Sequence, residues 1–137
     1  MKNRFAYIFI LAMLMCLSAC AAKKNLTVMD KLDGEWTCDA RATWALWHPG
    51  ERFTQDNDYK ALAQARLRLD MKNRKMVMWN EAFGPTSEVN STLNIVSQAP
   101  NSITIDDGDV FELKDATTLF IHDPQNPQKG FVFKRRK

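Results

Sequence analysis

Histidine, cysteine and clustered acidic side chains are the residues of this chain whose types could support metal binding or catalysis. The two histidines, His48 and His122, are far apart in sequence, and neither has a second histidine or cysteine at a metal-ligand spacing. The run Asp106–Asp109 lacks the alternating ligands and the distant glutamate of a calcium loop, and its Asp107-Gly108 pair is a strong hairpin-turn signal. No nucleophile elbow accompanies the serines. The sequence therefore predicts no metal site and no cofactor, and it does not predict an enzyme.

The N-terminal segment has the features of an export signal. Lys2 and Arg4 precede an apolar run of about fifteen residues, which is shorter than the roughly 20 residues that span a bilayer. The run ends at Leu17-Ser18-Ala19-Cys20. These four residues resemble the lipobox of bacterial lipoproteins, which implies that residues 1–19 are a cleaved signal peptide and that Cys20 receives the lipid. The alternative is an ordinary secretory signal, cut just before Cys20 and leaving it as a thiol.

The lipoprotein resemblance also implies where the protein resides. A mature bacterial lipoprotein carries several acyl chains, which is enough for stable anchoring, so the expected partner is a membrane bound through the lipid on Cys20. In enterobacteria an aspartate after the lipidated cysteine favours retention in the inner membrane, and Ala21 occupies that position here. The resemblance thus implies an outer-membrane lipoprotein that faces the periplasm, with the leaflet left open. We expect residues 20–31 to form the lipidated cysteine and a polar tether, and residues 32–137 to form one domain.

The net charge of the chain argues against nucleic acid as a partner, and the cysteine count leaves one cysteine without an intrachain partner. The chain has 19 basic and 16 acidic residues, and because residues 1–19 hold two of the basic ones and no acid, the rest has 17 basic against 16 acidic. This near-neutral balance gives no electrostatic reason to expect nucleic acid as a partner. Cys16 lies in the signal and Cys20 in the lipobox, so Cys38 is left without an intrachain partner. We expect Cys38 to be a buried thiol, since it alternates with Trp36, although an intermolecular bridge is an alternative.

Apolar and polar side chains alternate with a period of two from Gly34 onward, which is typical of half-buried strands. Asp58–Leu67 differs, because it is rich in helix formers and has Asp58 as a candidate N-cap, so a helical turn before residue 63 stays open. Eight antiparallel strands joined by short turns most economically close on themselves. The predicted fold class is therefore all-β, an eight-stranded antiparallel up-and-down barrel. We predict its strands over residues 34–46, 63–71, 75–81, 87–98, 102–106, 109–114, 117–122 and 130–134.

Leu32-x-Gly34-x-Trp36 at the start of the first strand resembles the opening of lipocalins and their calycin relatives. The later stretches Asn101–Ile105, Phe111–Leu113 and Phe131–Arg135 are similar to the second half of small bacterial lipocalin-like lipoproteins. The resemblance implies a lipocalin-like barrel with an arginine near the last strand covering the first-strand tryptophan. Arg135 and Trp36 are the matching residues.

Small side chains on the first two strands suggest a pocket inside this barrel. If these strands are antiparallel neighbours, Ala40 and Ala42 lie near Ala65 and Ala63, with Trp44 above them. The alternative is close packing of inward phenylalanines against the alanines. A sealed, dry cavity of about 300 Å³ would cost roughly 7 kcal/mol, so a pocket of that size should be open, occupied or absent. The candidate pocket residues are Trp36, Ala40, Ala42, Trp44, Ala63, Ala65 and Trp79.

Two functions from different classes are compatible with these features. The first is a membrane-anchored lipoprotein whose lipocalin-like barrel binds a small apolar or amphipathic ligand. The alternative is a periplasmic protein-interaction module, an inhibitor or an envelope assembly accessory, which contacts an envelope protein through barrel loops or outer surface. The aromatic-rich stretch Trp44–Tyr59 fits a lid, a portal or a contact surface, and the alternative is plain packing over the mouth of the barrel.

Overall fold

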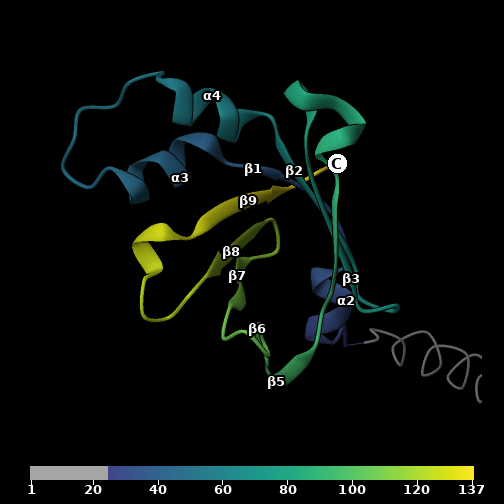
Figure 1. Ribbon diagram of the computed structural model, residues 1–137. Coiled ribbons are helices and arrows are strands. Elements are labelled where there is room, and N and C mark those ends of the chain that lie inside the picture. The colour runs from purple at the N-terminus through teal and green to yellow at the C-terminus, as the bar shows by residue number, and fades with distance from the viewer. Residues whose placement is uncertain (1–24) are drawn as a thin grey trace, which may run out of the picture.

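The computed structural model describes residues 25–137, which form an all-β fold with a few short helices (Figure 1). Nine antiparallel strands form one sheet in the order β4-β3-β2-β1-β9-β8-β7-β6-β5, and this sheet curls into a half-barrel. The strands are β1 (Gly34–Cys38), β2 (Ala65–Asp70), β3 (Lys75–Asn80), β4 (Val89–Thr92), β5 (Ile95–Ala99), β6 (Ser102–Ile105), β7 (Val110–Asp115), β8 (Thr118–His122) and β9 (Phe131–Arg135). The helices are α2 (Val28–Leu32), α3 (Ala40–Trp47), α4 (Asn57–Ala63), η1 (Glu81–Ser87) and η2 (Pro127–Lys129).

The strand predicted over residues 87–98 is two strands, which accounts for the difference between eight and nine. Its first part, β4, pairs with β3, and its second part, β5, pairs with β6. The change of partner occurs at Leu93, whose N–H donates to Arg74 O, and Asn94, whose carbonyl accepts from the N–H of Asp106. Because each half of this segment has a partner strand on one side only, β4 and β5 become the two edges of the sheet. The sheet is therefore curled, and no ladder joins β4 to β5.

The predicted first strand, residues 34–46, is wrong beyond Cys38, because Ala40–Trp47 is the helix α3. Asp39 begins this helix, since its carboxylate accepts a hydrogen bond from the N–H of Ala42 at 3.1 Å. Alanine side chains are small, so little buried apolar surface is lost when this segment forms a helix and not a strand. Alanine also has the highest intrinsic helix propensity. The segment therefore forms a helix even though its apolar and polar residues alternate as in a strand.

The side chain of Thr43 binds the backbone of β9 beyond the point where β1 ends at Cys38. The Thr43 hydroxyl accepts from the N–H of Val132 at 2.9 Å and lies 3.4 Å from the carbonyl oxygen of the same residue. These are backbone groups of β9 in the position where a longer β1 would pair. Thr43 is completely buried, so α3 closes the ladder at this end of the sheet through one side chain.

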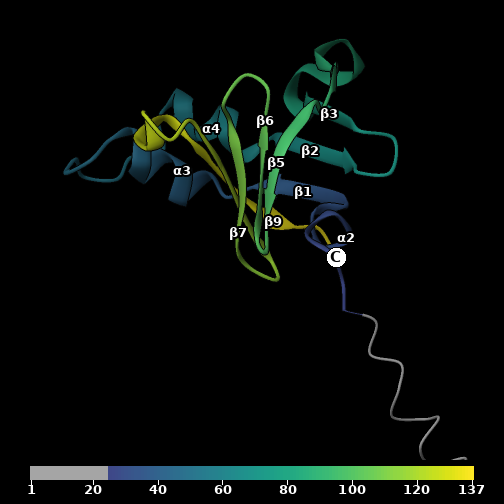
Figure 2. The ribbon, with the colours of Figure 1, turned by 90° about the horizontal axis from the view of Figure 1, so that it is seen from below.

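The segment before residue 67, which is compatible with a helix or a strand, forms a helix of about two turns in place of the single helical turn that the sequence leaves open. Helix α4 begins after Asp56, whose carboxylate accepts from the N–H of Tyr59 at 3.0 Å, so the N-cap lies two residues before the candidate Asp58. The helix ends at Ala63, and β2 begins at Ala65 rather than at residue 63. Helices α3 and α4 pack together at one end of the half-barrel (Figures 1 and 2).

At the other end of the half-barrel lies α2, which overlaps the expected tether (Figure 2). Thr27 and Asp30 form a capping box at its start, and Val28 and Leu32 are buried. Residues 28–31 therefore belong to the folded unit, because the buried side chains of α2 cover the end of the core. The signal segment 1–19 and Cys20 lie outside the described residues. Among residues 25–137, no helix is long and apolar enough to cross a membrane.

The core lies on the concave face of the sheet and is built around Trp36. The Trp36 indole N–H donates to Leu32 O at 3.1 Å, and the guanidinium carbon of Arg135 lies 4.2 Å from the centre of the Trp36 ring. The contact expected between Arg135 and Trp36 is thus present. Arg135 also donates to Asp33 O at 2.9 Å and to Lys31 O. These bonds join the segment before β1 to the last strand.

Candidate functional site

A pocket of about 310 Å³ lies inside the curl of the sheet. The register explains which residues line it, since Leu67 faces Met78 and Leu69 faces Met76 across β2 and β3, and residues paired in this way share a face. Phe111 pairs with Ile121 in the same manner on the opposite wall. The apolar side chains of the lining come from five strands, namely Met76, Met78, Ile105, Phe111, Ile121, Phe131 and Phe133. This apolar lining makes the concave pocket the best candidate for a ligand site.

Polar residues of two connections form one rim of the concave pocket. Asp107 and Asp109 belong to the β6–β7 turn, where Gly108 has a φ of 98° and the N–H of Asp109 donates to Asp107 Oδ1 at 3.0 Å. Asp123 and Lys129 belong to the β8–β9 connection that contains η2. Asp107, Asp123 and Lys129 are exposed, so this rim is in contact with water. The pocket thus combines an apolar floor with a charged opening.

The carboxylates of this rim differ in their pKa. Burial raises the pKa of Asp109 above its ordinary value, and the negative charges of Asp107 and Asp123 raise it further, while His122 opposes them. The pKa of Asp123 is lowered instead, first by the hydrogen bond that it accepts from the N–H of Gln125 at 2.9 Å. Asp109 is therefore the rim carboxylate whose negative charge is least compensated.

The seven candidate pocket residues do not line the concave pocket. Trp36 is a core residue beneath Arg135, and Ala40, Ala42 and Trp44 lie on α3 instead of a strand. Because those three positions are helical, the expected row of alanines does not form. Trp44 is itself buried, with 2% of its surface exposed.

Ala63, Ala65 and Trp79 are also placed away from the pocket. Ala63 ends α4 and Ala65 begins β2. Trp79 is paired with Arg66 and points to the convex face, where the Arg68 guanidinium lies 5.5 Å from its ring. Met76 and Met78, and not the candidate residue Trp79, line the pocket from this strand. Arg66 and Arg68 on the neighbouring strand were the signal that the Val77–Trp79 side is the solvent side.

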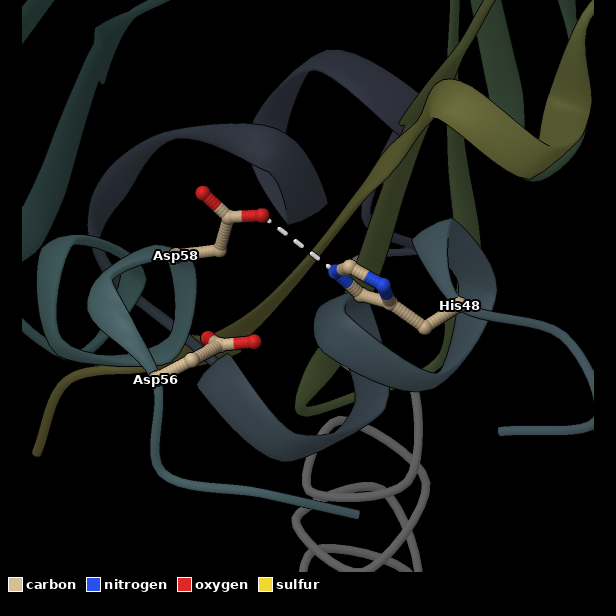
Figure 3. A group of neighbouring side chains, drawn as sticks. All are labelled: His48, Asp56 and Asp58. Atoms are coloured by element: carbon tan, nitrogen blue, oxygen red, sulfur yellow. Dashed lines mark hydrogen bonds and ion pairs between the residues drawn. The ribbon is translucent and has the colours of Figure 1, made fainter. Parts of the chain in front are cut away.

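The aromatic stretch between α3 and α4 forms a clamp that holds these two helices together. The Trp44 indole N–H donates to the Asp56 carboxylate, at 3.1 Å from Oδ1 and 3.0 Å from Oδ2, and the Trp44 ring stacks on His48 with centroids 4.4 Å apart. His48 Nε2 lies 3.3 Å from Asp58 Oδ2 (Figure 3). The stretch therefore packs over one end of the half-barrel.

His48, Asp56 and Asp58 each place a potential metal-ligand atom within 4.8 Å of the others. Asp56 already accepts bonds from Trp44 and from the first turn of α4, and these bonds lower its pKa. The group thus has a complete structural role as the cap and clamp of α4, and we assign no metal to it.

Two larger hollows, each of about 520 Å³, flank α2. Charged residues outnumber apolar ones among those that line them, with Lys31, Lys114 and Asp115 in one and Asp33, Lys72 and Arg74 in the other. Because a small-molecule site is mostly apolar with few polar groups, the concave pocket fits a ligand better than either hollow.

Comparison of the chain with protein-family models, with curated proteins and with solved structures gave no match. The geometry of the concave pocket is therefore the basis for the function proposed below.

Proposed function

We propose that this protein is a non-enzymatic outer-membrane lipoprotein, anchored through Cys20, whose half-barrel binds a small apolar or amphipathic molecule in the concave pocket. The observation that carries the proposal is the apolar lining of a pocket of about 310 Å³ that is open at a polar rim. This volume lies at the lower end of ligand sites, which are about 300–1,000 Å³. It equals the liquid volume of about ten water molecules, so the ligand or its buried part is small.

The apolar floor of the pocket favours a ligand over water. A sealed, dry cavity of this volume would cost about 7 kcal/mol at about 24 cal/mol per Å³, and because this pocket is open at its rim, water can enter it and only part of that cost applies. Water would relieve part of that cost at the rim but finds few hydrogen-bond partners among Met78, Phe111 and Phe133. A ligand with an apolar portion removes this cost most completely.

A lipocalin-like architecture is part of the proposal. The proposal treats β4 and β5 as one continuous segment that changes its partner strand at Leu93, so that the strands follow a simple up-and-down order with the first beside the last. The cover of Trp36 by Arg135 and the short helix α2 at the end of the core support the same assignment. Such a fold holds ligands on its inner face.

Binding is tested with full-length protein extracted from membranes, using an apolar fluorescent probe and its displacement by unlabelled amphiphiles. Met78→Trp fills the pocket and should weaken probe binding at least about tenfold. Val77→Trp is the matched control, because Val77 is the neighbouring residue on the opposite face of β3. The proposal is refuted if the wild-type protein binds no probe, or if the two variants weaken binding equally.

The anchor needs its own test. Cys20→Ser should abolish acylation and move the protein from the membrane fraction to the soluble fraction, as measured by metabolic labelling with a fatty-acid analogue and by fractionation. A Cys20→Ser protein that remains acylated would show that the lipobox assignment is wrong.

A second candidate function, contact with an envelope protein, is favoured by one observation. Phe83, Val89 and Val96 are 68%, 60% and 64% exposed, on η1 and on the two edge strands. Exposed apolar groups beside an unpaired sheet edge are typical of contact surfaces. A photoreactive amino acid at position 83 should then form one defined crosslink in intact cells, while the same group at the exposed residue Gln125 should not.

A further inference from the structure

Charge is distributed unevenly around the opening of the concave pocket. Three carboxylates, Asp107, Asp109 and Asp123, lie on the lining, against one lysine, Lys129. Within residues 25–137, no ion pair joins Lys129 to any of the three acids. The rim therefore has a net negative charge where it meets the apolar floor.

The least compensated of these charges is on Asp109. This residue is half-buried, and in the described part of the chain its carboxylate accepts no hydrogen bond, although its own N–H donates to Asp107. Its raised pKa, caused first by burial and then by Asp107 and Asp123, shows that the surroundings disfavour its negative charge. A cation placed beside it would relieve both the desolvation and the repulsion.

His122 is also a lining residue of the concave pocket, and it lowers the pKa of Asp109, but its ring makes its closest contacts away from the three acids of the rim. Its ring stacks on Phe120 with centroids 4.3 Å apart, and its Nε2 lies 3.5 Å from Glu112 Oε2. Glu112 pairs with Phe120 across β7 and β8, so all three side chains share the convex face of the sheet. Lys129 is therefore the one lysine or arginine among the described residues that line the pocket, and it forms no ion pair with the three acids.

We propose that the concave pocket selects amphiphiles with a positively charged head, an amine or another organic cation, whose apolar part packs on Met76, Phe111 and Phe133 while the head lies beside Asp109. This inference rests on the proposed function, because it names the ligand class of the same site. The apolar floor alone would accept a tail with any head. The charged rim is what discriminates, by attracting cationic heads and repelling anionic ones.

Three amphiphiles with the same ten-carbon alkyl tail test the proposal: decylammonium, decanol and undecanoate. Their binding to full-length protein is measured by displacement of the apolar fluorescent probe at low salt. We expect decylammonium to bind about tenfold more tightly than decanol, and undecanoate to bind most weakly. The preference should shrink in about 0.5 M salt, where ions screen charges beyond about 4–5 Å.

Isosteric variants locate the charge that is responsible. Asp109→Asn should weaken decylammonium binding by about threefold to fivefold, which is the range of one partly exposed ion pair, and should leave decanol binding unchanged. Lys129→Gln should strengthen decylammonium binding. Glu88→Gln removes one negative charge from an exposed position outside the pocket and should have no effect on any of the three probes.

The outcomes separate the inference from the function on which it rests. If none of the three probes binds, the proposed function itself fails. If all three bind equally, or if Asp109→Asn and Glu88→Gln have the same effect while Met78→Trp still blocks binding, the pocket is real and its cation preference is refuted. Thermal melting of each variant verifies that it is folded, and Asp107→Asn provides a second test of the rim charge should Asp109→Asn fail to fold.

Discussion

Replacing Thr43 by valine should loosen α3 from the sheet, because the Thr43 hydroxyl binds the backbone of β9 directly. Valine has nearly the same shape as threonine but cannot accept the hydrogen bond that the N–H of Val132 donates at 2.9 Å. The Val132 carbonyl keeps its other bond, from the N–H of Asp39 at 2.7 Å, so the substitution leaves one buried donor without a partner. An unsatisfied buried group costs about 1–3 kcal/mol, and we expect a loss of about 2 kcal/mol of unfolding free energy.

The assay is chemical denaturation combined with amide hydrogen exchange. A loss of about 2 kcal/mol corresponds to a fall in Tm of about 8 °C for a domain of this size. Thr43→Ser is the control, because it keeps the hydroxyl and loses one buried methyl group, which costs about 1 kcal/mol. Exchange of the Val132 amide should accelerate in Thr43→Val more than in Thr43→Ser. Equal exchange in both variants, or a Thr43→Val protein as stable as the wild type, would refute the assigned role of the hydroxyl.

Three further predictions concern single groups. Burial raises the pKa of the Cys38 thiol to about 11, so mass-mapped alkylation at pH 8 should leave Cys38 unlabelled until the protein unfolds, and rapid labelling of folded protein would contradict this. The hydrogen bonds from the Tyr59 N–H and then the Trp44 indole lower the pKa of Asp56 below its ordinary 3.8, so the stability it contributes is complete above that pH and is lost below it. Asp56→Asn should therefore reduce the difference in Tm between pH 6 and pH 3, and an unchanged difference would exclude Asp56 as a cause. A Cβ added at Gly130 would lie 2.7 Å from a carbonyl oxygen of β8, so Gly130→Ala should cost about 1–3 kcal/mol in urea denaturation, and an unchanged midpoint would show that the sheet can yield there.

The second half of the sheet was predictable because local signals agree with one another. Strands β6 to β9 alternate cleanly, and Asp107-Gly108 marks the hairpin between two of them. Phe111 and Phe133, which occupy the apolar phase of this alternation, are both buried. The contact between Arg135 and Trp36 was also expected, although from a resemblance rather than from spacing.

The first half of the chain was less predictable, because parts of its sequence fit both the two-residue period of a strand and the 3.6-residue period of a helix. Alanines in Ala40–Trp47 are compatible with a strand or a helix, and a helical cap at Asp39 settles the choice. In β3 both faces are apolar, so Met78 and Trp79 cannot be assigned to a side without knowing the neighbouring strand. The seven candidate pocket residues therefore lie outside the concave pocket, whose lining comes from other positions.

The pairing of β1 with β9 sets the order in which the domain can assemble. Arg135 bonds to a carbonyl 104 positions earlier in the chain, and Trp36 lies beneath it. Contacts between such distant segments form late, because the entropy of closing the loop is lost before the contact contributes. A chain emerging N-terminus first thus exposes one flank of β1 and the indole of Trp36 until β9 has arrived. During that interval the nascent domain is open to chaperones and proteases, and the final strand ends this vulnerable stage.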